Sequence, residues 1–119
     1  QVICELIRQG AAESGCMMNL VTADVDRGPT VSFCRYVIRD ASNAAAWDEA
    51  VPLIARNATQ DELEATSLYA DIRRRGVERE RPFLVETLRA AAEGRLPIPP
   101  PQPLDLTAEV ERAITAAAR

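Results

Sequence analysis

The chain has 119 residues, a net charge of −4 at pH 7 and no histidine, and all 14 of its basic residues are arginine. Without histidine and lysine the chain alone supplies no Ser-His-Asp triad, no Schiff-base lysine and no P-loop lysine. The net negative charge also argues against non-specific binding to nucleic acid or to an anionic membrane face.

The N-terminal segment predicts a short amphipathic helix. Within residues 2–13, the side chains of Val2, Ile3, Leu6 and Ile7 fall on one side at helical spacing. A strand is the competing interpretation, because the apolar run is short.

A β-hairpin is predicted next. Residues 16–39 are rich in β-favouring side chains on either side of the turn sequence at residues 26–29. We expect strands near 17–23 and 30–39. A two-stranded hairpin is marginally stable alone, so its apolar face should pack on helices or pair with another chain.

Most of the remaining sequence predicts helices. Pro52 predicts a kink or a restart in the first of them, Gly76 is expected to end the second, and Pro82 sits where a third would begin. Gly94 falls just past the predicted end of that third helix. We expect helices over residues 43–56, 60–75 and 82–93.

Two of these helices carry apolar patterns with different implications. In the helix over 82–93, Leu84, Val85 and Leu88 share one side, which is typical of ordinary core packing. In the helix over 60–75, Leu63 lies roughly opposite the main apolar stripe. We therefore weigh Leu63 as a partner contact against the simpler view that one exposed leucine needs no explanation.

The C-terminal part predicts a proline-rich spacer at 96–106 and an arm helix at 107–119, following a compact domain at 1–95. The arm carries an apolar stripe and is too short to be stable alone in water, so it must dock on its own domain or across a dimer. Both alternatives stay open. The arm's expected interaction residues are Leu106, Val110 and Ile114.

A run of arginines is the strongest basic feature. Arg73, Arg74, Arg75, Arg79 and Arg81 are candidates for phosphate contact, on nucleic acid for example. Consecutive residues fan around a helix, however, and acidic residues interleave with the later arginines. We therefore favour a structural role, in which these cations pair with local carboxylates near a helix C-terminus.

The cysteines and aspartates give no predicted catalytic, cofactor or metal site. Cys4, Cys16 and Cys34 show no C-x-x-C spacing, so we expect reduced, partly buried thiols, with a reactive cysteine as the alternative. Asp24 and Asp26 lie in the hairpin loop, but turn aspartates are common for backbone reasons.

Together these patterns predict a mostly helical α+β fold: an N-terminal helix, a β-hairpin, and a three- to four-helix bundle with a proline-tethered C-terminal helix. The favoured function is a non-enzymatic interaction, assembly or regulatory module, cytoplasmic, from a bacterium or phage. Its expected partner is protein, as a homo-oligomer formed through the arm or the hairpin edge, with no cofactor and no membrane. A nucleic-acid-binding regulator using the Arg73–Arg81 region and a small carboxylate- or cysteine-dependent enzyme are the alternatives.

Overall fold

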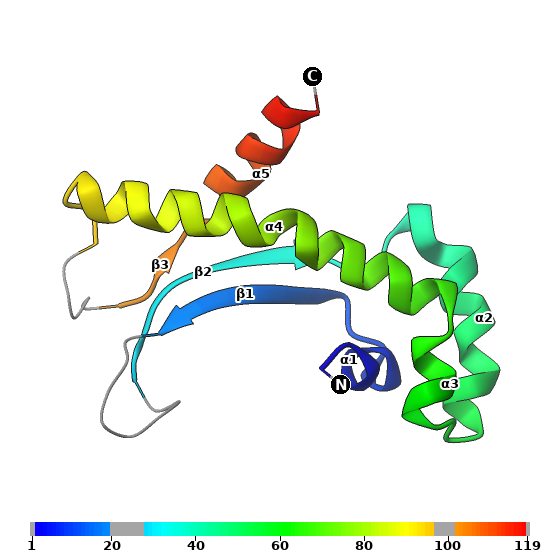
Figure 1. Cartoon of the computed structure of the whole chain (residues 1–119). Coiled ribbons are helices and arrows are strands. Elements are labelled where there is room, and N and C mark those ends of the chain that lie inside the picture. The colour runs from blue at the N-terminus through cyan, green and yellow to red at the C-terminus, as the bar shows by residue number, and fades with distance from the viewer. Residues whose placement is uncertain (1, 20–27, 97–101, 119) are drawn as a thin grey trace. The chain divides into compact units, whose positions relative to one another are not determined.

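The computed structural model describes residues 2–19, 28–96 and 102–118, and within them the fold is α+β and mostly helical, as predicted (Figure 1). In chain order the elements are α1 (Val2–Gln9), β1 (Glu13–Asn19), β2 (Thr30–Val37), η1 (Ala41–Asn43), α2 (Ala44–Ala55), α3 (Gln60–Glu64), α4 (Ser67–Ala92), β3 (Leu104–Asp105) and α5 (Thr107–Ala117). Residues 20–27, which include part of the predicted turn at 26–29, and residues 97–101 of the predicted proline-rich spacer lie outside the described residues. No helix in the described ranges is long and apolar enough to cross a membrane.

The sheet contains three strands in the order β1-β2-β3. The first two are the predicted hairpin strands, although β1 begins at Glu13, earlier than expected. The third strand was not predicted: Leu104 pairs with Ser32 in parallel, and Asp105 pairs with Phe33. Two residues next to a proline-rich segment carry no recognisable strand pattern, which is why only the structure reveals them.

Three helices end in the same hydrogen-bonded motif. In each of them, the residue that follows the C-cap has a positive φ. That residue is Gly10 after α1 (φ 64°), Asn57 after α2 (φ 56°) and Gly94 after α4 (φ 76°). At Gly94 the amide donates to the Ala91 carbonyl, and the Arg95 amide donates to the Ala90 carbonyl. This motif satisfies carbonyls that the helix leaves open, and it confirms the predicted stop at Gly94.

The prediction of separate helices over 60–75 and 82–93 is wrong. Helix α3 is a single short turn that ends at Glu64, and α4 then runs unbroken through both Gly76 and Pro82. Gly76 is suited to this place because a Cβ there would lie 2.8 Å from the Tyr36 hydroxyl oxygen. The glycine therefore marks a close side-chain approach and does not end the helix. A DNA-binding helix-turn-helix built from the two predicted helices would need a turn between Gly76 and Arg81, and α4 is continuous there.

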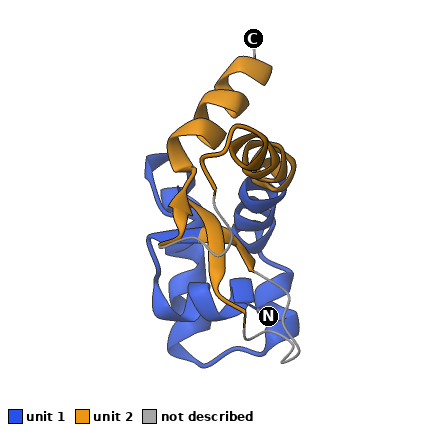
Figure 2. Cartoon of the chain, turned by 90° about the vertical axis from the view of Figure 1, so that its left-hand side faces the viewer, with its two compact units in different colours: residues 1–14, 36–77 blue, residues 15–35, 78–119 orange. Residues whose placement is uncertain are grey.

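The chain divides into two compact units, each assembled from two stretches of sequence (Figure 2). Unit 1 comprises residues 1–14 and 36–77, and unit 2 comprises residues 15–35 and 78–119. The core of unit 1 contains Cys4, Ile7, Ile38, Trp47, Ala50, Ala58, Leu63, Leu68 and Ile72. The buried core residues of unit 2 are Val31, Cys34, Phe83, Ala90, Leu96, Leu106 and Val110.

Candidate functional site

The most buried arginine of the predicted basic run is a structural centre of unit 1. Arg75 is 8% exposed and its guanidinium binds both carboxylate oxygens of Asp40, at 2.9 and 3.1 Å. It also donates to Asp71 (2.9 Å), to the Ser42 hydroxyl (2.7 Å) and to the Val37 carbonyl (3.0 Å). Two carboxylates neutralise this arginine inside the fold, so it is not presented to a phosphate.

The same network holds the pKa of Asp40 well below its usual range, first through the hydrogen bond from Arg75 and then through that from Ser42. A depressed pKa means that the folded state releases this proton more readily than the unfolded chain does. The resulting stability is therefore present above pH ~4 and is lost as the pH falls through the folded-state pKa.

This linkage predicts how Asp40→Asn differs from the wild type. The gap between their urea unfolding midpoints should be constant near neutrality and should shrink as the pH falls below ~4, where the Asp40 carboxylate of the unfolded wild-type chain becomes protonated while that of the folded chain stays ionised. Urea titrations followed by circular dichroism at several pH values measure the gap. An unchanged gap at the lowest pH contradicts the assignment.

The other four arginines of the run are distributed differently. Arg79, in unit 2, donates to both carboxylate oxygens of Glu111 on α5, at 2.9 and 3.2 Å. In unit 1, Arg74 pairs with Asp71 at 2.8 Å. Arg73 and Arg81 are exposed. The carboxylate pairing agrees with the structural role favoured from sequence, but the expected position near a helix C-terminus is wrong, because α4 continues to Ala92. Phosphate contact by this run stays a prediction.

The second half of α4 turns its apolar side outward, which contradicts the expected core packing of Leu84, Val85 and Leu88. These three side chains are 46%, 40% and 60% exposed. The same helix buries Glu86 (6% exposed) and Thr87 (3% exposed) on its inner side. This α4 outer face, defined by Leu84, Val85 and Leu88, is an apolar surface left uncovered in the described chain.

Buried polar groups on the inner side of α4 are satisfied, which explains how the helix tolerates this orientation. The Thr87 hydroxyl donates to the Phe83 carbonyl at 2.9 Å and lies 3.0 Å from the Ser32 hydroxyl on β2. The Glu86 carboxylate pairs with Arg89 at 3.2 Å. Because partners are in place, burying these groups does not carry the penalty of an unsatisfied polar atom.

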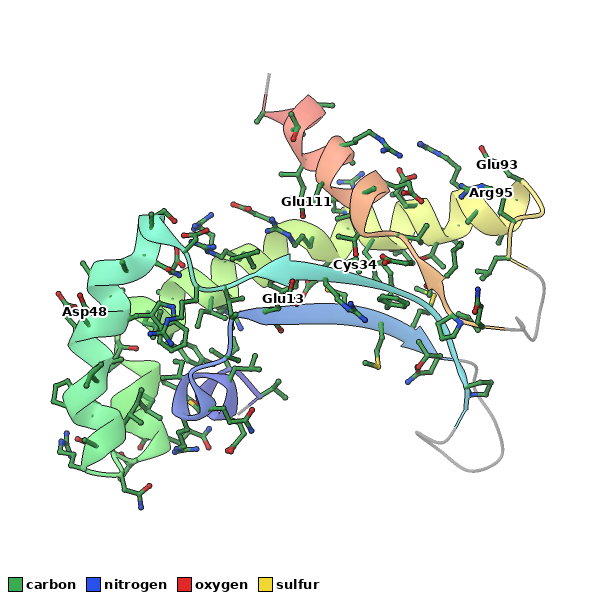
Figure 3. The ribbon with its side chains drawn as sticks, turned by 180° about the vertical axis from the view of Figure 1, so that it is seen from behind. Glu13, Cys34, Asp48, Glu93, Arg95 and Glu111 are labelled. Atoms are coloured by element: carbon green, nitrogen blue, oxygen red, sulfur yellow. The ribbon has the colours of Figure 1, made fainter. Side chains whose placement is uncertain are left out.

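A groove of about 780 Å³ lies between α4 and α5 in unit 2 and adjoins the α4 outer face through Val85. Its lining includes charged residues, among them Glu93 and Arg95, which are 2.8 Å apart and lie at the C-terminal end of α4 (Figure 3). The residues lining it are Arg81, Pro82, Val85, Glu86, Arg89, Glu93, Arg95, Glu109, Arg112, Ala113 and Ala116. The groove thus combines small apolar residues with paired arginines and glutamates.

The predicted interaction residues are covered by their own chain. Leu63 is 1% exposed in the core of unit 1, so the view that it is simply an exposed leucine is wrong. Leu106 and Val110 are 0% exposed in unit 2, with Ile114 packed against them. Within this chain the arm helix therefore buries its apolar stripe on the unit that carries it.

Two cysteines that are distant in sequence meet in unit 2. Cys16 on β1 packs against the cluster that contains Cys34 on β2 (Figure 3 labels Cys34). The strands approach each other closely beside this pair: a Cβ on Gly15 would lie 2.7 Å from the Cys34 carbonyl oxygen. The two thiols share a hydrogen bond.

That hydrogen bond separates the acidities of the two thiols. It lowers the pKa of Cys16 to about 7, with the charge of Arg79 lowering it further against the opposing effects of burial and of Glu80. It raises the pKa of Cys34, and burial raises it more. Sequence reasoning missed the pair because 17 residues separate the two thiols and no C-x-x-C spacing marks them.

The described residues contain no candidate metal site. Residues 2–19, 28–96 and 102–118 contain no group of three cysteine, aspartate or glutamate side chains arranged to hold a metal ion. Asp24 and Asp26 lie outside these ranges. The thiol pair is thus the one cluster of reactive side chains described in unit 2 that the arginine–carboxylate pairs do not account for.

Comparisons with known proteins leave these local features as the basis for inference. No protein-family model, no curated protein and no solved structure matches the chain. The function must therefore be argued from the α4 outer face, the adjoining groove and the thiol pair.

Proposed function

We propose that this chain is a protein-interaction module that binds a second copy of itself through the α4 outer face. The observation that carries the proposal is the inverted helix: Leu84 and Leu88 face outward while Glu86 and Thr87 are buried. Single exposed apolar residues are ordinary, but three large ones within five residues of one helix form a contiguous patch.

A second copy suits this patch because a two-fold axis pairs unlike positions on one helix. An antiparallel arrangement puts Leu84 of one copy against Leu88 of the other, and the reverse contact follows by symmetry. The exposed charges of Glu80 and Arg81 then lie beside the patch and not in its centre. The arm and the hairpin edge rank behind this surface, since Leu106 and Val110 are already covered.

The size of the patch sets the expected affinity. Full burial of a leucine or valine side chain stabilises by about 1.5–3 kcal/mol, and these side chains are only about half exposed. Three such side chains from each copy form a small apolar contact, which has to offset the rotational and translational cost of association. The self-association is therefore weak, and we expect a Kd in the millimolar range.

Sedimentation velocity over a wide concentration range tests the proposal. The wild type should show a concentration-dependent monomer–dimer equilibrium, and the double variant Leu84→Glu/Leu88→Glu should remain monomeric, because it places like charges in the contact. Val51→Glu is the matched control, since Val51 on α2 is 56% exposed and belongs to unit 1, whereas the patch belongs to unit 2.

Two outcomes of this experiment would contradict the proposal. A wild type that stays monomeric at millimolar concentration overturns self-association, and so does a Val51→Glu variant that is disrupted as strongly as the double variant. Circular dichroism on each variant establishes that the helical content is retained, so a monomeric variant is read as loss of contact and not as unfolding.

A further inference from the structure

The thiol pair in unit 2 supports an inference that is independent of self-association. Cys16 is half-buried and Cys34 is 1% exposed, and they lie on neighbouring strands of one sheet. Both side chains pack in the cluster formed by Phe83, Leu106 and Val110. Cys16 is thus partly accessible to solvent, while Cys34 is covered and packs in the same cluster.

We propose that Cys16 and Cys34 are a redox-active thiol pair that closes to a cross-strand disulfide after a hydroperoxide oxidises Cys16. The Ile38 amide donates to the Ala12 carbonyl at 2.9 Å, and the antiparallel register that continues from this bond places Cys16 opposite Cys34 (Figure 1). Directly opposed residues on neighbouring strands have Cα atoms about 4.5–5.5 Å apart, which is inside the range that a disulfide spans. The narrow gap beside Gly15, where the backbone of Cys34 approaches β1, favours this closure.

The two steps conserve atoms and electrons. In the first, the Cys16 thiolate attacks one oxygen of the hydroperoxide, the O–O bond breaks, and an alcohol (water, if the oxidant is hydrogen peroxide) leaves with a solvent proton. This step produces a sulfenic acid at Cys16. In the second, the Cys34 sulfur attacks the Cys16 sulfur, the S–O bond breaks, and hydroxide leaves as water with the Cys34 proton. Two thiols lose two electrons and the peroxide gains them.

The surroundings of the two sulfurs differ, and this difference assigns one the attack on the peroxide and the other the closure of the disulfide. The thiolate is the attacking species, and the hydrogen bond donated by Cys34 together with the positive charge of Arg79 favours the thiolate at Cys16. The higher pKa of Cys34 keeps that thiol protonated until the sulfenic acid forms. Cys16 is therefore the peroxidatic sulfur and Cys34 the resolving one.

Treatment of the reduced full-length chain with hydrogen peroxide near neutral pH tests the pair. The wild type should lose two of its three thiols, its mass should fall by two hydrogen atoms, and non-reducing peptide mapping should recover a Cys16–Cys34 linkage. Cys16→Ser should keep its remaining thiols, whereas Cys34→Ala should accumulate a sulfenic acid at Cys16 that dimedone traps. Cys4→Ala, altered at the buried thiol of unit 1, is the control and should behave as the wild type.

A second measurement isolates the hydrogen bond from burial. Alkylation of Cys16 by iodoacetamide, followed against pH, should be about tenfold slower near neutrality in Cys34→Ala, because the Cys16 pKa then returns toward that of an ordinary thiol. Cys34→Ser retains an O–H donor and should largely restore the rate. Equal peroxide reactivity in the wild type and Cys16→Ser, or oxidation that yields no internal disulfide, overturns the proposal.

Discussion

Arg75→Ala is expected to lower the free energy of unfolding by about 3 kcal/mol, the largest effect of any single arginine in the chain. The substitution removes the cation that both Asp40 and Asp71 share, as well as the donors to Ser42 and Val37. The Arg75 side chain is 10% exposed and that of Asp71 is 22% exposed, so removing the cation takes a partner from a carboxylate that is partly shielded from water. The penalty should therefore exceed that of an exposed pair.

Two further variants make the prediction specific. Arg75→Lys keeps the charge but loses the planar fork that binds both oxygens of Asp40, so an intermediate loss is expected. Arg73→Ala removes an exposed arginine of the same helix and should change the stability by less than about 0.5 kcal/mol. Urea denaturation gives all three values. A loss below about 1 kcal/mol for Arg75→Ala contradicts the structural role.

Val110→Ala is expected to destabilise the chain by about 2 kcal/mol through loss of buried methyl groups and the cavity left behind. Val110 is 0% exposed and packs in the cluster that contains Cys34, Phe83 and Leu106. Because α5 is short, its position on unit 2 depends on such contacts and not on intrinsic helix stability.

The control for Val110→Ala is the same substitution at Val51, which is 56% exposed on α2. Alanine favours helix at both positions by a similar amount, so the difference between the two variants reports burial alone. Thermal and urea unfolding measure it. Equal stabilities for the two variants are incompatible with a docked α5.

The elements that were predicted correctly are those marked by local chemistry. The N-terminal helix, the hairpin and α2 follow from apolar periodicity, β-favouring residues and turn residues. The spacing from Thr59 to Glu62 produces a capping box at α3. Each of these signals depends on residues that are close together in the sequence. In these elements, contacts with distant parts of the chain do not override the local preference.

The errors concern α4, where contacts distant in sequence decide the outcome. Gly76 and Pro82 are usually signs of helix ends, yet the helix continues through both. The pattern of Leu84 and Leu88 identified an apolar side correctly, but periodicity does not say which side faces the core. The Thr87–Ser32 contact, 55 residues apart in sequence, helps fix that choice.

The candidate sites were hidden for the same reason. Cys16 and Cys34 become neighbours only through the alignment of β1 with β2, and the groove exists only where α4 and α5 pack together. The arginine run was visible from sequence, and so was its tendency to pair with acids. The identity of the acids was not, because Asp40 and Glu111 lie more than 30 residues from their partners.

The interleaved construction of the two units sets an order in which they can be completed on the ribosome. Both stretches of unit 1 have been synthesised once residue 77 is made, whereas the hairpin of unit 2 is not covered until α5 has been synthesised. Until then β2 lacks its third strand, and Cys34 lacks the covering side chains of Leu106 and Val110. A nascent chain that stalls before residue 104 thus contains every residue of the unit 1 core, while the apolar residues of the unit 2 hairpin stay uncovered. Uncovered apolar residues bind chaperones or aggregate.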